Sequence, residues 1–143
     1  MKVNAFASPS ETQVVDLVCR MLPLQFGHSC LTAVEVRSHG TARTDIVVLL
    51  GAEVIGIEVK VAAWKRGLAQ AAFNRFCVDR SYIALWTAGE IKETIIAEAS
   101  RLGVGVIAVS EATIRVVLDA PLASPTPCIR RRMSERVLSG SAY

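Results

Sequence analysis

Three ionisable residues stand close together on two neighbouring apolar segments of the chain. Glu58 and Lys60 lie in the run GIEVKV, residues 56–61, and Asp45 lies near the start of the preceding run TDIVVLL, residues 44–50. Because alternate side chains of a strand point to the same face, Glu58 and Lys60 would share one face of a sheet. Charges in an apolar layer are costly unless a partner compensates them, so this spacing indicates a site for an ion or a charged ligand.

The connection between the two runs decides which residues face each other. Gly51-Ala52 is a two-residue loop with glycine first, which favours a type II′ hairpin turn. Asp45 then lies opposite Glu58, on the face of Lys60, with β-carbons about 5 Å apart. A three-residue loop would turn Asp45 to the other face. That other face is apolar and is expected to pack against a helix; it carries Ile46, Val48, Leu50, Ile55, Ile57 and Val59.

Two opposed carboxylates repel each other unless a cation bridges them or one of them keeps a proton. Mg²⁺ prefers oxygen ligands and keeps several waters, and Asp45, Glu58 and the Val59 carbonyl suit it. Mn²⁺ is expected to substitute for Mg²⁺. Lys60 would orient or help deprotonate a water and offset the charge of a phosphate. The alternative is a surface ion-pair network on a sheet face open to solvent.

This arrangement resembles the D…E-x-K signature of the PD-(D/E)XK nuclease superfamily, with Asp45 followed thirteen residues later by Glu58-Val59-Lys60. The resemblance covers about residues 8–87 and implies a restriction-endonuclease-like core in the order α-β-β-β-α-β. It also implies DNA as the substrate, Asp45 and Glu58 as metal ligands, and Lys60 as the catalytic lysine. Thr44 stands where the signature has proline.

Two further residues match parts of this superfamily. Glu11 matches an acidic residue that resolvase-like members bring to the metal, although a capping role at its own helix is the other interpretation. Gln70 stands where RecB-like members have a glutamine, which would place water or phosphate. Asn74 replaces the aromatic residue that often follows that glutamine.

Several polar residues are candidates for nucleic-acid contact. Arg66, Gln70 and Asn74 fall at i, i+4 and i+8, which makes one stripe of a helix that is either solvated or beside the cleft. Glu35 is expected to be a paired strand-face charge, or else a further ligand. The cations expected near phosphates are Arg43, Lys65, Arg66, Arg130, Arg131 and Arg132. The last three form either a solvated tail or an arm whose binding weakens with salt.

The segments around these residues predict an α/β fold. Ser8-Pro9-Ser10-Glu11 indicates an N-cap and a helix from Pro9 to about Leu22, and Thr87-Ala88-Gly89-Glu90 indicates a second capping box, opening a helix that ends at Gly103. A further helix is expected over 67–80, and strands over 31–38, 44–50, 53–62, 81–87, 104–110 and 112–120. The order α-β-β-β-α-β-α-β-β predicts a single layered domain, residues 1–120, with a central mixed sheet flanked by helices. Residues 121–143 are expected to be a basic C-terminal appendage, either a short helix or a mobile segment.

Composition narrows the class of protein. Hydrophobic residues make up 52% of the 143 residues and charged residues 20%, which fits a domain with buried strands. No apolar run approaches the roughly 18 residues of a membrane span, and the apolar stretch within residues 1–10 is too short for a secretory signal, so we expect a cytoplasmic protein. The four cysteines are far apart, and with two histidines they predict free thiols and not a zinc cage.

Charge is distributed unevenly along the chain. Residues 1–60 hold five Lys/Arg and six Asp/Glu, whereas residues 61–143 hold eleven and seven, which is compatible with a polyanionic partner. From the predicted site, and from the resemblance, which implies the DNA substrate, we expect a Mg²⁺-dependent endonuclease that hydrolyses DNA. The alternatives are a catalytically idle nucleic-acid- or protein-binding module on the same fold, or an RNA-directed nuclease. Spanning a duplex would require a homodimer or a larger protein partner, and no membrane is involved.

Overall fold

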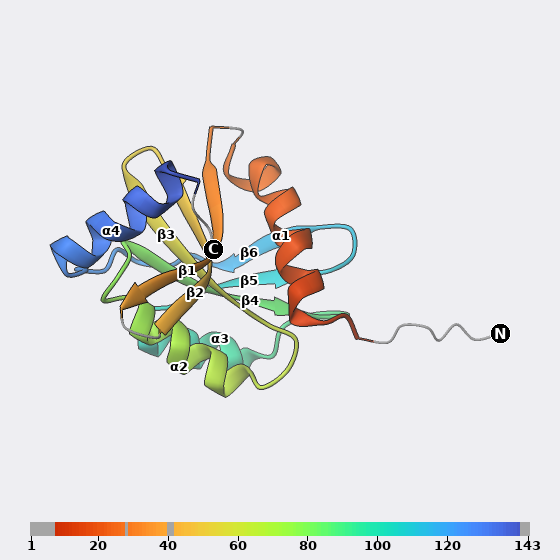
Figure 1. The fold of residues 1–143 in the computed structure, drawn as a ribbon. Helices are drawn as coiled ribbons and strands as arrows, with labels where there is room; N and C mark the ends of the chain where they lie inside the picture. Colours follow the sequence, from red (N-terminus) through yellow and green to blue (C-terminus); the bar gives the residue numbers. More distant parts are fainter. Residues whose placement is uncertain (1–7, 28, 40–41, 141–143) are drawn as a thin grey trace.

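A six-stranded mixed sheet lies between one helix and a layer of three in the computed structural model, which describes residues 8–27, 29–39 and 42–140 (Figure 1). The helices are α1 (Glu11–Phe26), α2 (Trp64–Asn74), α3 (Glu93–Leu102) and α4 (Pro127–Leu138). The strands are β1 (Leu31–His39), β2 (Ala42–Leu50), β3 (Glu53–Lys60), β4 (Arg80–Trp86), β5 (Gly105–Val109) and β6 (Ile114–Leu118). The predicted α/β class, element order and layering are confirmed, and α4 follows them.

The strands lie in the sheet in the order in which they occur in the chain. β1, β2 and β3 form an antiparallel meander, β3, β4 and β5 run parallel, and β6 returns antiparallel to β5. In the β2–β3 hairpin the pairs run from Leu50–Glu53 to Ile46–Ile57, and Gly51 has φ +62°, as the first residue of a type II′ turn requires. The predicted register of this hairpin is confirmed.

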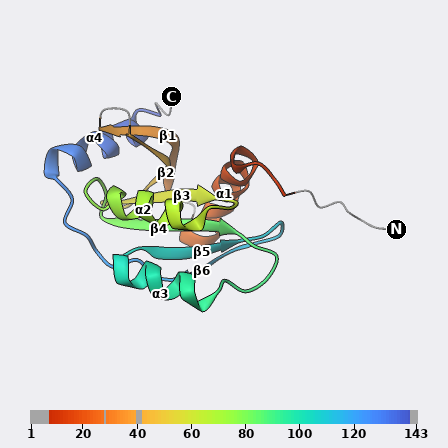
Figure 2. The same ribbon diagram turned by 90° about the horizontal axis from the view of Figure 1, so that it is seen from below.

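Each face of the sheet has its own helical cover, which Figures 1 and 2 show from two directions. Val14, Val18 and Leu22 of α1 pack on the apolar face of the hairpin, as predicted. On the opposite face, Leu68 of α2 and Ile95 of α3 cover β4 and β5. On that same face, Met133 and Val137 of α4 cover β1 and β2. The pleat places Glu58 and Lys60 on the face of α2 and α4.

The first helix begins later than the sequence pattern predicts. Ser10, not Ser8, is the N-cap: its hydroxyl accepts a hydrogen bond from the Gln13 N–H at 3.1 Å, and Gln13 Oε1 accepts one from the Ser10 N–H at 2.8 Å. Glu11 is therefore the first residue of α1, and its capping-box role is wrong, because Gln13 fills it. The helix also continues past Leu22 and Pro23 to Phe26.

Two other helix boundaries differ from the prediction. Thr87 Oγ1 accepts the Gly89 N–H at 3.1 Å, which closes a local turn instead of a capping box, so α3 begins at Glu93. α3 ends at Gly103 as predicted, with φ +74°. α2 spans Trp64–Asn74 and not 67–80, because the chain turns after Asn74 and the Asp79 carboxylate accepts the Val54 N–H at 2.8 Å.

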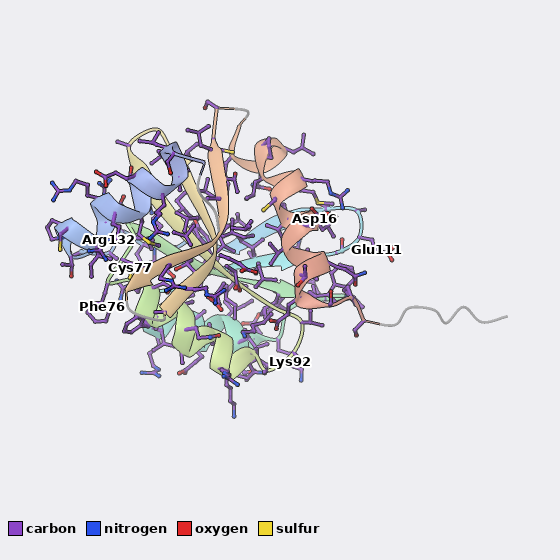
Figure 3. The ribbon with its side chains drawn as sticks, in the orientation of Figure 1. Asp16, Phe76, Cys77, Lys92, Glu111 and Arg132 are labelled. Atoms are coloured by element: carbon purple, nitrogen blue, oxygen red, sulfur yellow. The ribbon has the colours of Figure 1, made fainter. Side chains whose placement is uncertain are left out.

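The C-terminal segment forms a packed helix, the first of its two predicted alternatives. α4 buries Met133 and Val137, and Figure 3 places its Arg132 on the side of the molecule that carries Cys77, away from Asp16 of α1. Residues 1–7 and 141–143 are outside the described part, so most of the segment considered for a secretory signal is too. The division at residue 120 stays a prediction. Within the described ranges, no helix is long and apolar enough to cross a membrane.

Candidate active site

A cleft of about 610 Å³ opens between the end of the β1–β2 hairpin, β3 and α2. Seven of the residues predicted from the sequence line it: Arg43, Asp45, Glu58, Lys60, Arg66, Gln70 and Asn74. They come from three elements that are separated in the chain. The fold therefore brings the predicted carboxylates, lysine and amides to one place.

The two carboxylates are not a simple cross-strand pair. The β2–β3 ladder has its last pair at Ile46 and Ile57, and Asp45 Oδ2 accepts the Val59 N–H at 2.8 Å. The Asp45 side chain thus takes a place that a backbone carbonyl would have in a continued ladder. In a strand, the N–H and C=O of one residue point to the same side. The Val59 carbonyl therefore faces the Asp45 side and not the β4 ladder.

The backbone beside Asp45 is distorted on its other flank as well. β1 pairs Val34 with Ile46 and Val36 with Thr44, and Glu35 between them has φ +51°, in the left-handed region. Such a conformation is costly for a residue with a side chain and is often found at functional sites. Glu35 Oε1 lies 3.2 Å from Arg43 Nη1, so Glu35 is a paired charge, as one of its two interpretations predicts.

Glu58 is the most perturbed ionisable group of the cleft. It is 4% exposed, and its Oε1 has no hydrogen-bond partner. Burial and then the neighbouring Asp45 charge raise the pKa of Glu58 to about 8, against opposing effects of Lys60 and Asn74. Burial also raises the pKa of Asp45, although the Val59 N–H acts in the opposite direction. Without a cation, the two carboxyl groups therefore share a proton near neutral pH.

Lys60 connects the first helix to this pair of carboxylates. Its side chain is 13% exposed, and its Nζ lies 3.8 Å from Glu11 Oε2. The contact forms because α1 begins at Glu11, close to the end of β3. Glu11 therefore contacts the site through the lysine, and its role at a metal stays a prediction.

Helix α2 supplies the wall over Glu58. A β-carbon placed on Gly67 would lie 2.5 Å from Lys60 Cγ, so the helix backbone approaches the lysine closely. Asn74 is 4% exposed, and Asn74 Nδ2 and Gln70 Oε1 are buried without hydrogen-bond partners. The interpretation of this stripe as a solvated face is wrong for Asn74, because the helix turns it under the cleft rim.

Four predicted nucleic-acid contacts do not line the cleft. Lys65 Nζ lies 5.7 Å from the Trp64 ring centroid, and Arg131 is exposed on α4. Arg132 donates to the Ser38 carbonyl at 3.4 Å. Arg130 Nε lies 2.9 Å from Asp79 Oδ1 and Nη2 contacts the Ala52 carbonyl, so this arginine anchors α4 to the β2–β3 turn. Their roles in binding stay predictions.

One aromatic residue of the cleft was absent from the sequence-based candidates, as were two alanines, Ala42 and Ala69. Phe73 is 47% exposed and lines the cleft beside Asn74. It falls seven residues after Arg66 and three after Gln70, which is the spacing of one helix face. This helical spacing could have identified Phe73 from the sequence, whereas a search for polar residues selects only Arg66, Gln70 and Asn74.

The donor set for a cation is small. In residues 8–27, 29–39 and 42–140, no group of three or more His, Cys, Asp or Glu side chains gathers as a metal site. The side-chain oxygen donors that line the cleft are the carboxyl groups of Asp45, Glu58 and Glu35, the last paired with Arg43, and the amides of Gln70 and Asn74. The Val59 carbonyl lies on the side of Asp45. The four cysteines are free, as predicted.

Comparisons with known proteins give a fold and no family. No protein-family model and no curated protein matches the chain. A solved protein of unknown function from Silicibacter pomeroyi matches with a TM-score of 0.71 and 18% identity, over 95% of this chain and 89% of that chain. Pyrococcus furiosus SfsA, solved in complex with Ca²⁺, matches with a TM-score of 0.44 and 14% identity, over 73% and 60%. The first likeness shows the fold alone.

Proposed function

We propose that the protein is a Mg²⁺-dependent phosphodiesterase that hydrolyses the DNA backbone. The observation that carries the proposal is the pair of neighbouring carboxylates, Asp45 and Glu58, at the floor of an open cleft beside a nearly buried lysine. The raised pKa of Glu58 means that this pair is disfavoured as two anions in the absence of a cation. A site at which the pKa of a buried carboxyl group is strongly shifted is a candidate for function.

The residues present fit a hard divalent cation. Glu58 Oε1 and Gln70 Oε1 are buried acceptors without hydrogen-bond donors, and both line the cleft. Asp45 is held in place by the Val59 N–H, which fixes one oxygen and leaves the other for a ligand. Two carboxylates, one amide and one backbone carbonyl are oxygen donors of the kind that Mg²⁺ takes, with waters for the remaining positions.

Each residue has a part in the proposed chemistry. A cation held by Asp45 and Glu58 would supply Lewis acidity that polarises a phosphodiester oxygen. Lys60, positioned by Glu11, offsets the negative charge that develops on the phosphate. Gln70 orients a water or a phosphate oxygen by hydrogen bonding. Arg43 and Arg66, on opposite walls of the cleft, neutralise the flanking backbone.

The decisive experiment is incubation with plasmid, linear, single-stranded and branched DNA, and with RNA, in Mg²⁺, Mn²⁺ or EDTA. We expect cleavage of DNA with either metal and none in EDTA. Cleavage of RNA alone would establish the RNA-directed alternative. Absence of cleavage, together with no heat of Mg²⁺ binding by calorimetry, would establish the idle binding module.

A further inference from the structure

Phe73 is an exposed aromatic residue on the wall of a charged cleft. Its ring contacts Phe76 with centroids 5.8 Å apart and planes tilted by 60°. Phe76 is 59% exposed and does not line the cleft, whereas Phe73 does. An exposed phenylalanine is common by itself, so its neighbours decide what it could bind.

Those neighbours follow one face of α2. Arg66, Gln70 and Phe73 lie at i, i+4 and i+7, and all three line the cleft. At 1.5 Å per residue, the first and the last are roughly 10 Å apart along the helix axis. Ala69 lies between them and contributes only a methyl group, which leaves the wall open there. The wall therefore offers a cation, an amide and an aromatic ring in sequence.

We propose that Phe73 stacks against an unpaired nucleobase whose backbone passes Arg66 toward the Asp45–Glu58 floor. The inference deepens the proposed function and rests on it, since it names the substrate as single-stranded or locally unpaired nucleic acid. In an intact duplex the faces of the bases are covered by their neighbours, so a side chain reaches a base face only where the stack is open. Aromatic side chains beside basic residues are the usual platform for such bases.

The charge and size of the cleft favour this occupant. Arg43, Lys60 and Arg66 line the same cleft as Phe73, together with the carboxyl groups of Glu35, Asp45 and Glu58, so the aromatic ring sits among charged groups and not in an apolar pocket. A volume of about 610 Å³ lies within the roughly 300–1,000 Å³ of sites that enclose one small ligand. One nucleotide unit belongs to that size class, whereas a duplex does not. An apolar peptide would offer no anion to Arg66, which is exposed on the wall of the cleft.

The test measures binding in EDTA, where no cleavage occurs. Single-stranded oligonucleotides with one 2-aminopurine, and the matching duplexes, are titrated with wild type, Phe73→Ala, Phe73→Trp and Phe76→Ala. We expect wild type to prefer the single strand and to quench 2-aminopurine. Phe73→Ala should bind it roughly tenfold more weakly, the loss of one base–aromatic stack, without quenching. Phe73→Trp should restore both, and Phe76→Ala should match wild type.

Equal binding by wild type and Phe73→Ala, or equal losses in Phe73→Ala and Phe76→Ala, would overturn the inference. If Phe73→Ala does not fold, as judged by thermal unfolding, Phe73→Leu replaces it and the same outcomes apply. A failure of the proposed function would give a different set of results. Base stacking at Phe73 without metal-dependent cleavage would overturn the phosphodiesterase alone, whereas duplex cleavage unaffected by Phe73→Ala would overturn the single-strand inference alone.

Discussion

At the scale of single residues, the two carboxylates of the cleft have different surroundings. Asp45 is fixed by the Val59 N–H, whereas Glu58 is almost fully buried with one oxygen unpaired. A hydrogen bond to the charged form favours ionisation, and burial without one opposes it. In the metal-free site, ionisation is therefore less favourable for Glu58 than for Asp45. Substitutions of Glu58 should lower activity without lowering the stability of the metal-free protein.

Glu58→Gln keeps the size of the side chain and removes its charge. In EDTA we expect the variant to be as stable as wild type or slightly more so, because the repulsion with Asp45 disappears. Excess Mg²⁺ should raise the melting temperature of wild type only, by ligand linkage. Plasmid cleavage should fall by roughly a hundredfold or more. Glu90→Gln, at an exposed site outside the cleft, is the matched control. A Glu58→Gln variant that cleaves like wild type would return Glu58 to an ordinary strand charge.

The raised pKa of Glu58 also predicts how metal-free stability depends on pH. The folded protein keeps the proton up to about pH 8, whereas the unfolded chain releases it near the ordinary value of 4.5. Between these values the folded state binds more protons, so the free energy of unfolding falls as pH rises. Urea unfolding in EDTA at pH 5, 6.5 and 8 should show this decline as the difference between wild type and Glu58→Gln. A difference that is constant with pH would contradict it.

At the scale of elements, the site depends on how closely α2 lies on the sheet. A β-carbon on Gly67 would lie 2.5 Å from Lys60 Cγ and 2.7 Å from Ile83 Cδ1. The same helix turns Gln70, Phe73 and Asn74 toward Glu58, so its distance from β3 sets the depth of the cleft. α4 packs on β1 and β2 through Met133 and Val137, and its Arg130 pairs with Asp79, whose carboxylate also accepts the Val54 N–H next to the β2–β3 turn.

Gly67→Ala tests the close approach of α2. In an exposed helix this change would stabilise by about 1 kcal/mol, since alanine is the better helix former. Here the added methyl group must displace Lys60 or Ile83, so we expect a lower melting temperature and slower cleavage. Gly89→Ala is the control, because nothing lies within 4 Å of its added β-carbon. A more stable Gly67→Ala variant with full activity would show that α2 can move away from Lys60 and Ile83 at no cost to the fold or the site.

Arg130→Ala tests the anchor of α4. Burial acts to raise the pKa of Asp79, but the hydrogen bonds from Arg130 and the Val54 N–H and the nearby arginines lower it overall. The pair therefore stabilises the fold above the ordinary carboxyl pKa, and that stabilisation is lost as pH falls. At pH 7 we expect Arg130→Ala to lose roughly 1–3 kcal/mol in urea unfolding. Arg131→Ala, on the exposed side, should lose nothing measurable. Equal stability of the two would contradict an anchoring role.

At the scale of the whole molecule, the excess of positive charge is spread and not concentrated at the cleft. The chain carries a net charge of +3, yet Arg43 is paired with Glu35 and Arg130 with Asp79. Arg66 is exposed on the rim of the cleft. Long-range attraction alone is therefore weak at moderate salt, and local cations should carry the salt dependence of binding.

Arg66→Ala should reduce that dependence. Each phosphate contact contributes about 0.7 to the slope of log affinity against log salt for a single strand, so the slope should fall by about that amount. The measurement is fluorescence anisotropy at several salt concentrations in EDTA. Arg115→Ala, exposed on β6 at the opposite edge of the sheet, should leave the slope unchanged. Equal slopes for all three proteins would remove Arg66 from the interface.

The sequence by itself determined the features that depend on neighbouring residues. Strand alternation placed Glu58 and Lys60 on one face, and the Gly51-Ala52 loop set the register of the hairpin, because a two-residue turn allows one pairing. The apolar stripe of the hairpin predicted its cover, which α1 provides. These features depend on residues that are close in the sequence, so they can be predicted without knowing how the rest of the chain packs.

Only the tertiary structure decided the features that depend on contacts between distant elements. The β2–β3 ladder ends at Ile46, where the Asp45 side chain accepts the Val59 N–H. The approach of Glu11 to Lys60 and the burial of Asn74 follow from how helices pack on the sheet. Arg130 looks like a member of a basic run, and its partner Asp79 is 51 residues away. Packing selects one arrangement among many that satisfy the same local pattern, because close contacts across the core are specific to shape and not to periodicity.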